Sequence, residues 1–204
     1  TKREHVDRLP GVILPDNICI EADLEKACMD KNVIVFAVAS PFVRMTAQRA
    51  KEYIKEGQII VNVAKGIEDV TYKTLSEIIE DEIPCAKVCV LSGPSHAEEV
   101  SKGIPTTCVV GAKTKELAEY VQDVFICDNF RVYSSPDVLG IELGAALKNV
   151  IALAAGIVDG LGYGDNTKAA LITRGITEIA RLGVSMGAKV ETFAGLSGIG
   201  DLIV

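Results

Sequence analysis

A single lysine in an otherwise small and aliphatic segment is the residue of this sequence best suited to chemistry. Lys148 lies in the segment from Glu142 to Gly156, which is composed mainly of Gly, Ala, Leu, Ile and Val and is predicted to be helical. Burial of an ammonium group is costly unless the group is paired or loses its proton, so a buried lysine has a lowered pKa and can act as a general base. Small neighbours such as Gly144 and Ala145 would leave room for another molecule. The alternative is a lysine that extends along the helix so that its ammonium reaches water.

A second group of candidates follows the predicted strands. Runs of β-branched and apolar residues at 33–38, 59–63 and 88–91 are typical of strands buried on both faces of a parallel sheet. In such sheets, ligands bind beyond the carboxyl ends of the strands. The carboxyl ends of the three runs carry the turns Ser40-Pro41-Phe42, Lys65-Gly66 and Gly93-Pro94-Ser95. Alternatively, these three turns are ordinary strand-to-helix turns, which need Gly, Pro and Ser in any case.

The elements that would position these residues alternate along the first two thirds of the chain. Helical patterns separate the strand-like runs, which predicts βαβ units and a parallel sheet. After Pro136, only Gly- and Ala-rich helical patterns follow. The predicted fold class is therefore α/β: a partial Rossmann-like parallel sheet in residues 1–135, followed by the start of an all-helical second domain in residues 136–204. The further predicted elements are helices at 43–56, 115–125, 138–159 and 167–186, a helix capped by Thr74, and strands at 106–110 and 130–133.

Composition narrows the function classes. The chain has 204 residues and a net charge of −7, which argues against non-specific binding to nucleic acid or to an anionic membrane. The longest apolar run, around Val150 to Val158, is too short to span a bilayer. The 6 cysteines form no C-x-x-C pair, which favours reduced thiols in a cytoplasmic protein over a disulfide framework or a metal site. Arg174, Glu178 and Arg181 have the spacing of a charged stripe on one helix face.

Five motifs occur in an order and at spacings that together are specific. The motifs are Leu9-Pro10-Gly11-Val12-Ile13-Leu14-Pro15, Val63-Ala64-Lys65-Gly66-Ile67-Glu68, Leu91-Ser92-Gly93-Pro94-Ser95-His96-Ala97-Glu98-Glu99-Val100, Glu142-Leu143-Gly144-x-x-Leu147-Lys148-Asn149 and Gly195-Leu196-x-Gly198-x-Gly200-Asp201-Leu202. Together they resemble the bacterial form of NAD(P)-dependent glycerol-3-phosphate dehydrogenase, and the resemblance covers essentially the whole chain.

This resemblance implies a Rossmann domain and a helical domain with the active site between them. Enzymes of this family interconvert dihydroxyacetone phosphate and sn-glycerol 3-phosphate with NAD or NADP, NADPH being somewhat favoured. In bacteria this reaction supplies the backbone of phospholipids. The resemblance implies a cytoplasmic enzyme that acts on a small-molecule substrate, binds no metal and no nucleic acid, and is not inserted in a membrane. A homodimer is a possible oligomeric state. The resemblance also implies a general acid/base role at the substrate C2 oxygen for Lys148, substrate contacts for Lys65, Gly93, Ser95, Asn149 and Asp201, and cofactor contacts for Lys65, Ala97 and Phe42.

The sequence also departs from that family. No strand–G-x-G-x-x-G–helix pattern occurs, so the pyrophosphate loop is expected before Thr1, and the family's Arg-Asn phosphate-binding element after Val204. We therefore expect a fragment, truncated at both ends, with little activity of its own. Two alternatives stay open: another dehydrogenase with a Rossmann and a helical domain, of the β-hydroxyacid or ketopantoate type, or a non-catalytic binding fragment. The dehydrogenase interpretation predicts that Lys65, Lys148 and Asp201 lie near one another in space.

Overall fold

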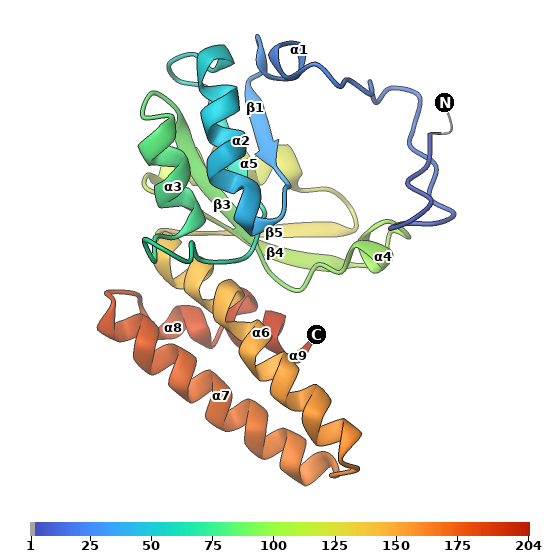
Figure 1. The fold of residues 1–204 in the computed structure, drawn as a ribbon, viewed down its shortest axis with the longest axis vertical. Helices are drawn as coiled ribbons and strands as arrows, with labels where there is room; N and C mark the ends of the chain where they lie inside the picture. Colours follow the sequence, from blue (N-terminus) through green and yellow to red (C-terminus); the bar gives the residue numbers. More distant parts are fainter. Residues whose placement is uncertain (1–2) are drawn as a thin grey trace.

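A five-stranded sheet with the spatial order β1-β2-β3-β4-β5 forms one half of the molecule (Figure 1). The structure is a computed structural model that describes residues 3–204. The strands form where the sequence has continuous β-branched and apolar runs, as expected for strands that are buried on both faces. Their bounds are β1 Val33–Phe36, β2 Ile59–Asn62, β3 Lys87–Ser92, β4 Thr106–Ala112 and β5 Phe130–Ser135.

The predicted fold class, a Rossmann-like sheet followed by helices, is confirmed, with one difference: the sheet is mixed and contains one antiparallel pair of strands. β1, β2 and β3 pair in parallel, as do β4 and β5, but β3 and β4 are antiparallel. A parallel connection needs a crossover that is long enough to cover the sheet and return. Between β3 and β4 the only helix is α4, Ala97–Val100, whose 4 residues are too short for that. Consequently, β1, β2 and β3 share one carboxyl edge, where the sequence places its candidate site, whereas β4 and β5 end at the opposite edge.

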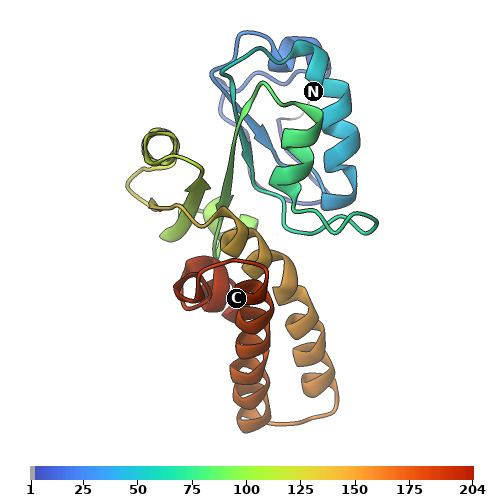
Figure 2. The ribbon, with the colours of Figure 1, turned by 90° about the vertical axis from the view of Figure 1, so that its left-hand side faces the viewer.

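Helices cover both faces of this sheet (Figure 2). On one face, α2 (Val43–Ala50) and α3 (Leu75–Glu82) bury their apolar sides against β1 and β2. Thr74 caps α3 and forms the expected capping box with Glu77. On the other face, α5 (Lys115–Phe125) packs over β4 and β5. The shorter elements are α1 Leu24–Cys28, and the 3-10 helices η1 Ser40–Phe42 and η2 Lys51–Tyr53.

From Val138 to the last described residue, the chain is helical. Two long helices, α6 (Val138–Gly160) and α7 (Asp165–Ser185), pack side by side and extend away from the sheet (Figures 1 and 2). Asp137 caps α6 by accepting a hydrogen bond from the Gly140 N–H. Against the first half of α6 pack α8 Val190–Phe193, the π-helical turn η3 Leu196–Gly200 and α9 Asp201–Ile203.

The helix α6 is, by length and composition alone, long and apolar enough to cross a membrane, although the sequence contains no uninterrupted apolar run of that length. Core helices of soluble proteins pass the same test. The first two turns of α6 are buried within the protein, from Gly140 to Ala145. Glu142 and Lys148 both have polar partners on other elements. The segment of α6 from Gly140 to Ala145 therefore belongs to the protein core and includes the hydrogen-bonded Glu142.

Candidate active site

At the carboxyl edge of β1, β2 and β3, two glycines allow close approaches: Gly66 brings the turn after β2 against the turn after β1, and Gly93 brings the turn after β3 against β4. Gly66 has φ +155°, and a Cβ atom on it would lie 2.6 Å from the Cβ of Ser40. Gly93 has φ +148°, and a Cβ atom there would lie 3.0 Å from the Thr107 carbonyl oxygen. Any other residue at these positions would need both a strained backbone and a displaced neighbour. The turns after β1 and β2 are thus in direct contact beside Lys65.

The ammonium groups of Lys65 and Lys148 bind the two oxygens of one carboxylate. Lys65 Nζ lies 2.6 Å from Asp201 Oδ2, and Lys148 Nζ lies 2.6 Å from Asp201 Oδ1. Lys65 comes from the end of a sheet strand, Lys148 from the middle of α6, and Asp201 from the start of α9. The structure therefore brings together the three residues that the sequence analysis expected to be neighbours.

Each of the two ammonium groups retains a donor for a ligand. Lys65 also donates to the Gly93 carbonyl oxygen at 3.1 Å, and Lys148 donates to the Asp201 carbonyl oxygen at 2.9 Å. An ammonium has three N–H donors. Within residues 3–204, each lysine uses two of them, so one N–H on each side of Asp201 is available to an oxygen-rich molecule.

Burial makes the charges of this cluster depend on one another. The Asp201 side chain is 1% exposed, and those of Lys65 and Lys148 are 25% and 17% exposed. A carboxylate buried to this degree requires paired charges. Burial lowers the pKa of Lys65, Lys148 lowers it further, and Asp201 acts in the opposite direction. The sequence analysis expected burial to lower the pKa of Lys148; in the structure, burial lowers the pKa of Lys65.

The room that the sequence analysis expected beside Gly144 is occupied by the protein itself. A Cβ atom on Gly144 would lie 2.5 Å from the Ser197 carbonyl oxygen. Without a side chain at this position, the backbone of η3 lies directly against α6, and η3 leads into Asp201. The small residue in α6 therefore serves to bring Asp201 within reach of Lys148.

A hollow of about 420 Å³ opens beside Lys65 at the carboxyl ends of β1 and β2. Apart from Lys65, its lining consists of small or apolar residues: Ala37, Val38, Ala39, Ser40, Val63 and Ala64. A larger hollow of about 680 Å³ lies near the amino ends of β2 and β3, where Ile59 and Lys87 line it. It contains none of the predicted site residues, so the hollow beside Lys65 is the one associated with the lysine cluster.

The remaining predicted residues form no hydrogen bond with the side chains of Lys65, Lys148 or Asp201 within residues 3–204. Ser95 donates its hydroxyl to the Gly93 carbonyl oxygen at 3.1 Å, which is the same oxygen that Lys65 binds. Asn149 follows Lys148 on α6, is exposed, and makes no side-chain hydrogen bond within the described part of the chain. Ala97 begins α4 and is exposed, and Phe42 in η1 is 55% exposed.

Sequence reasoning overlooked two polar clusters near these turns. Glu142 is buried at 5% exposure and accepts hydrogen bonds from the backbone N–H and the hydroxyl of Ser76. A carboxylate within an apolar segment was the available signal for it. Arg44 binds Glu68 and Glu82, and no sequence spacing indicates that contact. The predicted stripe on α7 is present, with Glu178 paired to both Arg174 and Arg181 at the surface.

Comparison with protein families assigns the chain. A family model described as the N-terminus of NAD-dependent glycerol-3-phosphate dehydrogenase matches residues 1–118, and the corresponding C-terminus model matches residues 137–204. The chain belongs to this family. The resemblance inferred from the five motifs is thereby confirmed.

Relatives and solved structures agree with this assignment. Glycerol-3-phosphate dehydrogenase (NAD(P)+) of Agathobacter rectalis is 62% identical over 203 residues, which is 100% of this chain and 60% of the relative. The Fusobacterium nucleatum protein of the same name is 58% identical and is covered to 61%, with 99% of this chain aligned. The crystal structure of glycerol-3-phosphate dehydrogenase from Coxiella burnetii has a TM-score of 0.91 at 34% identity, over 96% of this chain and 60% of that one. The chain thus spans about 60% of the length of the curated relatives that it matches.

Proposed function

We propose that the full-length enzyme carrying this sequence interconverts dihydroxyacetone phosphate and sn-glycerol 3-phosphate with NAD or NADP. The observation that carries this proposal is the pair of ammonium groups on the two oxygens of Asp201, at the carboxyl edge of the parallel strands. Membership of the dehydrogenase family supplies the reaction class.

Lys148 is proposed as the general acid/base. When a ketone is reduced, negative charge develops on its oxygen, and a positioned ammonium can both stabilise that charge and transfer a proton to it. In the reverse direction, the amine of Lys148 would accept the proton of the alcohol. Asp201 holds Lys148 by its carboxylate and its carbonyl oxygen, which leaves one N–H for the substrate oxygen. Asp201 is proposed to bind a substrate hydroxyl as well.

Lys65 is proposed to serve substrate and cofactor together. It lies between the Asp201 cluster and the hollow of about 420 Å³. The small residues around that hollow fit the reactive end of a nicotinamide cofactor, which supplies or accepts a hydride when bound. Ala97 and Phe42 are proposed as further cofactor contacts, and Gly93, Ser95 and Asn149 as substrate contacts. The choice between NAD and NADP is left to the assay below.

A cytoplasmic location fits the cysteines, all of which are free thiols in the structure. A small phosphorylated molecule is proposed as the only kind of substrate.

The test is an assay of the full-length enzyme carrying this sequence. Nicotinamide absorbance is followed with dihydroxyacetone phosphate and either NADPH or NADH. Turnover of dihydroxyacetone phosphate, with far slower use of unphosphorylated dihydroxyacetone, supports the proposal. Reduction of a 2-keto acid or of ketopantoate in its place would favour the other dehydrogenase class. Tight cofactor binding without any turnover would favour a binding protein.

A further inference from the structure

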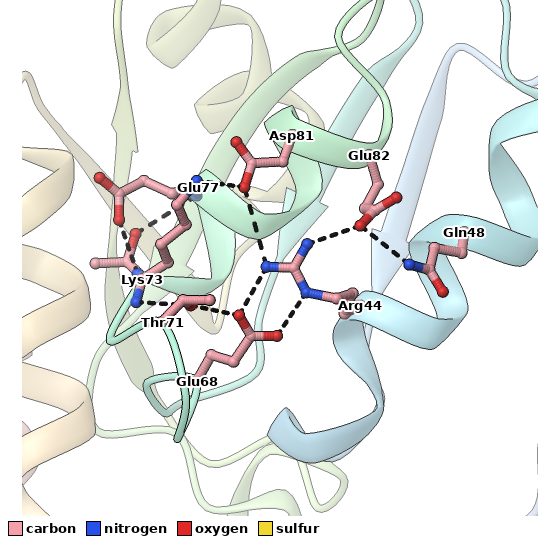
Figure 3. A network of polar contacts seen from close by, with 9 residues as sticks. Arg44, Gln48, Glu68, Thr71, Lys73, Glu77, Asp81 and Glu82 are labelled. Carbon is pink, nitrogen blue, oxygen red and sulfur yellow. Dashed lines mark hydrogen bonds and ion pairs between the residues drawn. The ribbon is translucent and has the colours of Figure 1, made fainter.

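An arginine outside the lysine cluster joins two of the loops that form the site. Arg44 lies in the first turn of α2, immediately after the Ser40–Phe42 turn. Its guanidinium binds Glu68 through two parallel hydrogen bonds, with Nε 2.6 Å from Oε1 and Nη2 2.7 Å from Oε2. Glu68 lies three residues after Lys65 in the loop that connects β2 to α3 (Figure 3).

The same guanidinium also holds α3. Its Nη1 lies 2.7 Å from Oε1 of Glu82, which Gln48 also contacts at 3.1 Å. Arg44 therefore makes two separable links, one to the Lys65 loop through Glu68 and one to α3, through Glu82 and, at 3.9 Å, through Asp81. The hydroxyl of Thr71 adds a further hydrogen bond to Glu68 from within the loop.

The geometry distinguishes this network from an ordinary surface ion pair. Exposed ion pairs contribute little, whereas bidentate arginine–carboxylate contacts in a network are both stronger and more directional. The side chains of Arg44, Glu68 and Glu82 are only 28%, 21% and 16% exposed. The Arg44 guanidinium lowers the pKa of Glu68 to about 2, so that Glu68 stays ionised at any working pH.

The Lys65 loop is held on two sides close to the site, and its far end is held separately by the ion pair of Lys73 with Asp81 on α3. On the side of the site, Gly66 lies directly against Ser40, and behind the site Glu68 is bound to Arg44. Both Ser40 and Arg44 belong to the connection from β1 into α2. The two loops therefore cannot separate without breaking the Arg44–Glu68 contact.

We propose that Arg44 and Glu68 are positioning residues, which hold the loop after β2 so that the Lys65 ammonium stays on Asp201. The kinetic part of this proposal rests on the proposed dehydrogenase function, and its structural part does not. A misplacement of about 1 Å at a reacting group can reduce rates about 100-fold. Loss of the contact is therefore expected to reduce kcat/KM by about 10- to 100-fold.

The test compares variants of the full-length enzyme carrying this sequence. Arg44→Ala removes both links, Glu68→Gln weakens the loop link alone, and Glu82→Gln weakens the α3 link alone. Arg49→Ala is the matched control, because Arg49 lies on the same helix, is exposed, and forms no ion pair within residues 3–204. Hydrogen–deuterium exchange of the amides from Gly66 to Lys73 is measured together with kcat/KM.

The expected result is faster exchange in this loop and a lower kcat/KM for Arg44→Ala and Glu68→Gln, with neither change in Glu82→Gln or Arg49→Ala. Glu68→Gln retains the shape of the side chain, so it keeps the test decisive if Arg44→Ala does not fold. Unchanged loop exchange in folded Glu68→Gln, or faster exchange with undiminished kcat/KM, would overturn the proposal. If the unmodified enzyme lacks dehydrogenase activity, the proposed function fails, while the exchange measurement still decides whether the loop is held by Arg44.

Discussion

Lys148 and Asp201 are joined by two hydrogen bonds from one ammonium group, at 2.6 Å to the carboxylate and at 2.9 Å to the backbone carbonyl oxygen. The two residues are 53 positions apart in the chain. Two bonds to one residue restrict where the ammonium can lie, so Lys148 is oriented before any substrate arrives. This preorganisation is what a proton-transfer role requires.

Replacing Lys148 by alanine in the full-length enzyme should lower kcat far more than it raises KM. A positioned acid/base contributes about 10²–10⁴-fold, so a loss in that range is expected. Steady-state kinetics with dihydroxyacetone phosphate measure it. Lys148→Arg should not restore turnover, because guanidinium keeps its proton at working pH. An arginine variant with most of its turnover would instead indicate a purely electrostatic role.

Replacing Asp201 by asparagine should impair substrate use more than cofactor affinity. The two ammonium groups would then lose the carboxylate between them and repel each other, so the pKa of Lys65 should fall further. We expect kcat/KM for the substrate to fall at least about tenfold, since charged hydrogen bonds contribute about 1.5–3 kcal/mol. The alkaline limb of the pH–rate profile should move to lower pH. An equal loss of cofactor affinity, measured by nicotinamide fluorescence, would contradict this role.

Replacing Lys65 by alanine should weaken the binding of both substrate and cofactor. The side chain contacts Gly93 and Asp201 and borders the hollow beside β1 and β2. A loss of about 10-fold or more in each affinity follows from the value of a charged hydrogen bond. Lys113→Ala is a suitable control, since Lys113 pairs with Glu80 at the surface, away from the site. Unchanged affinities in Lys65→Ala would place Lys65 outside the working site.

The parts of the fold that the sequence predicted are those with a local cause. Strands such as Val33–Phe36 were predictable because a continuous apolar run has few other uses. The direction of β4 was not predictable, because an apolar run is compatible with either strand direction. The direction depends instead on whether the segment between two strands is long enough for a crossover. The antiparallel pairing of β3 with β4 within the predicted Rossmann-like sheet was not foreseen for that reason.

The site residues also differ in whether a local sequence signal could predict them. Lys65 and Lys148 could be predicted because a charge at the end of a buried strand, or within an apolar helix, conflicts with its local environment. The Arg44–Glu68 contact joins residues 24 positions apart, and neither charge conflicts with its local sequence environment. Charged residues occur throughout a surface, and only the folded loops show which pairs meet. The structure places these residues, but the roles of all the predicted site residues stay predictions: Lys148, Lys65, Gly93, Ser95, Asn149, Asp201, Ala97 and Phe42.

Glu142 should make stability depend on pH. Burial raises the pKa of its carboxyl group above the ordinary value of 4.5, with Ser76 opposing that rise. Between 4.5 and the raised pKa, the folded protein therefore binds more protons than the unfolded chain, and stability falls as pH rises through that window. The slope from one proton is at most about 1.4 kcal/mol per pH unit. Glu142→Gln, which keeps the hydrogen-bonding shape, should lack this slope.

Urea unfolding of the two proteins across the acidic range measures the difference. The free energy of unfolding of the unmodified protein, relative to Glu142→Gln, should be highest at low pH and decrease as pH rises. Glu98→Gln provides the comparison, because Glu98 is exposed on α4 and forms no ion pair within residues 3–204. Parallel pH curves for the unmodified protein and Glu142→Gln would show that folding does not shift the pKa of Glu142.

A glycine pair on α6 tests whether the close approach of η3 sets the position of Asp201. In Gly144→Ala the new methyl would lie 2.5 Å from the Ser197 carbonyl oxygen, so the backbone before Asp201 must shift. In Gly156→Ala on the same helix, no atom lies within 4 Å of the new methyl. Helix propensity alone favours both changes by about 0.5–1 kcal/mol, whereas overpacking costs about 1–3 kcal/mol. Gly156→Ala should therefore be neutral or stabilising. Gly144→Ala should be destabilising and should lower kcat/KM, because Asp201 is displaced from Lys148.

Thermal unfolding and steady-state kinetics of the full-length variants measure both effects. If the two variants behave alike, the contact of η3 with Gly144 does not set the geometry of the site.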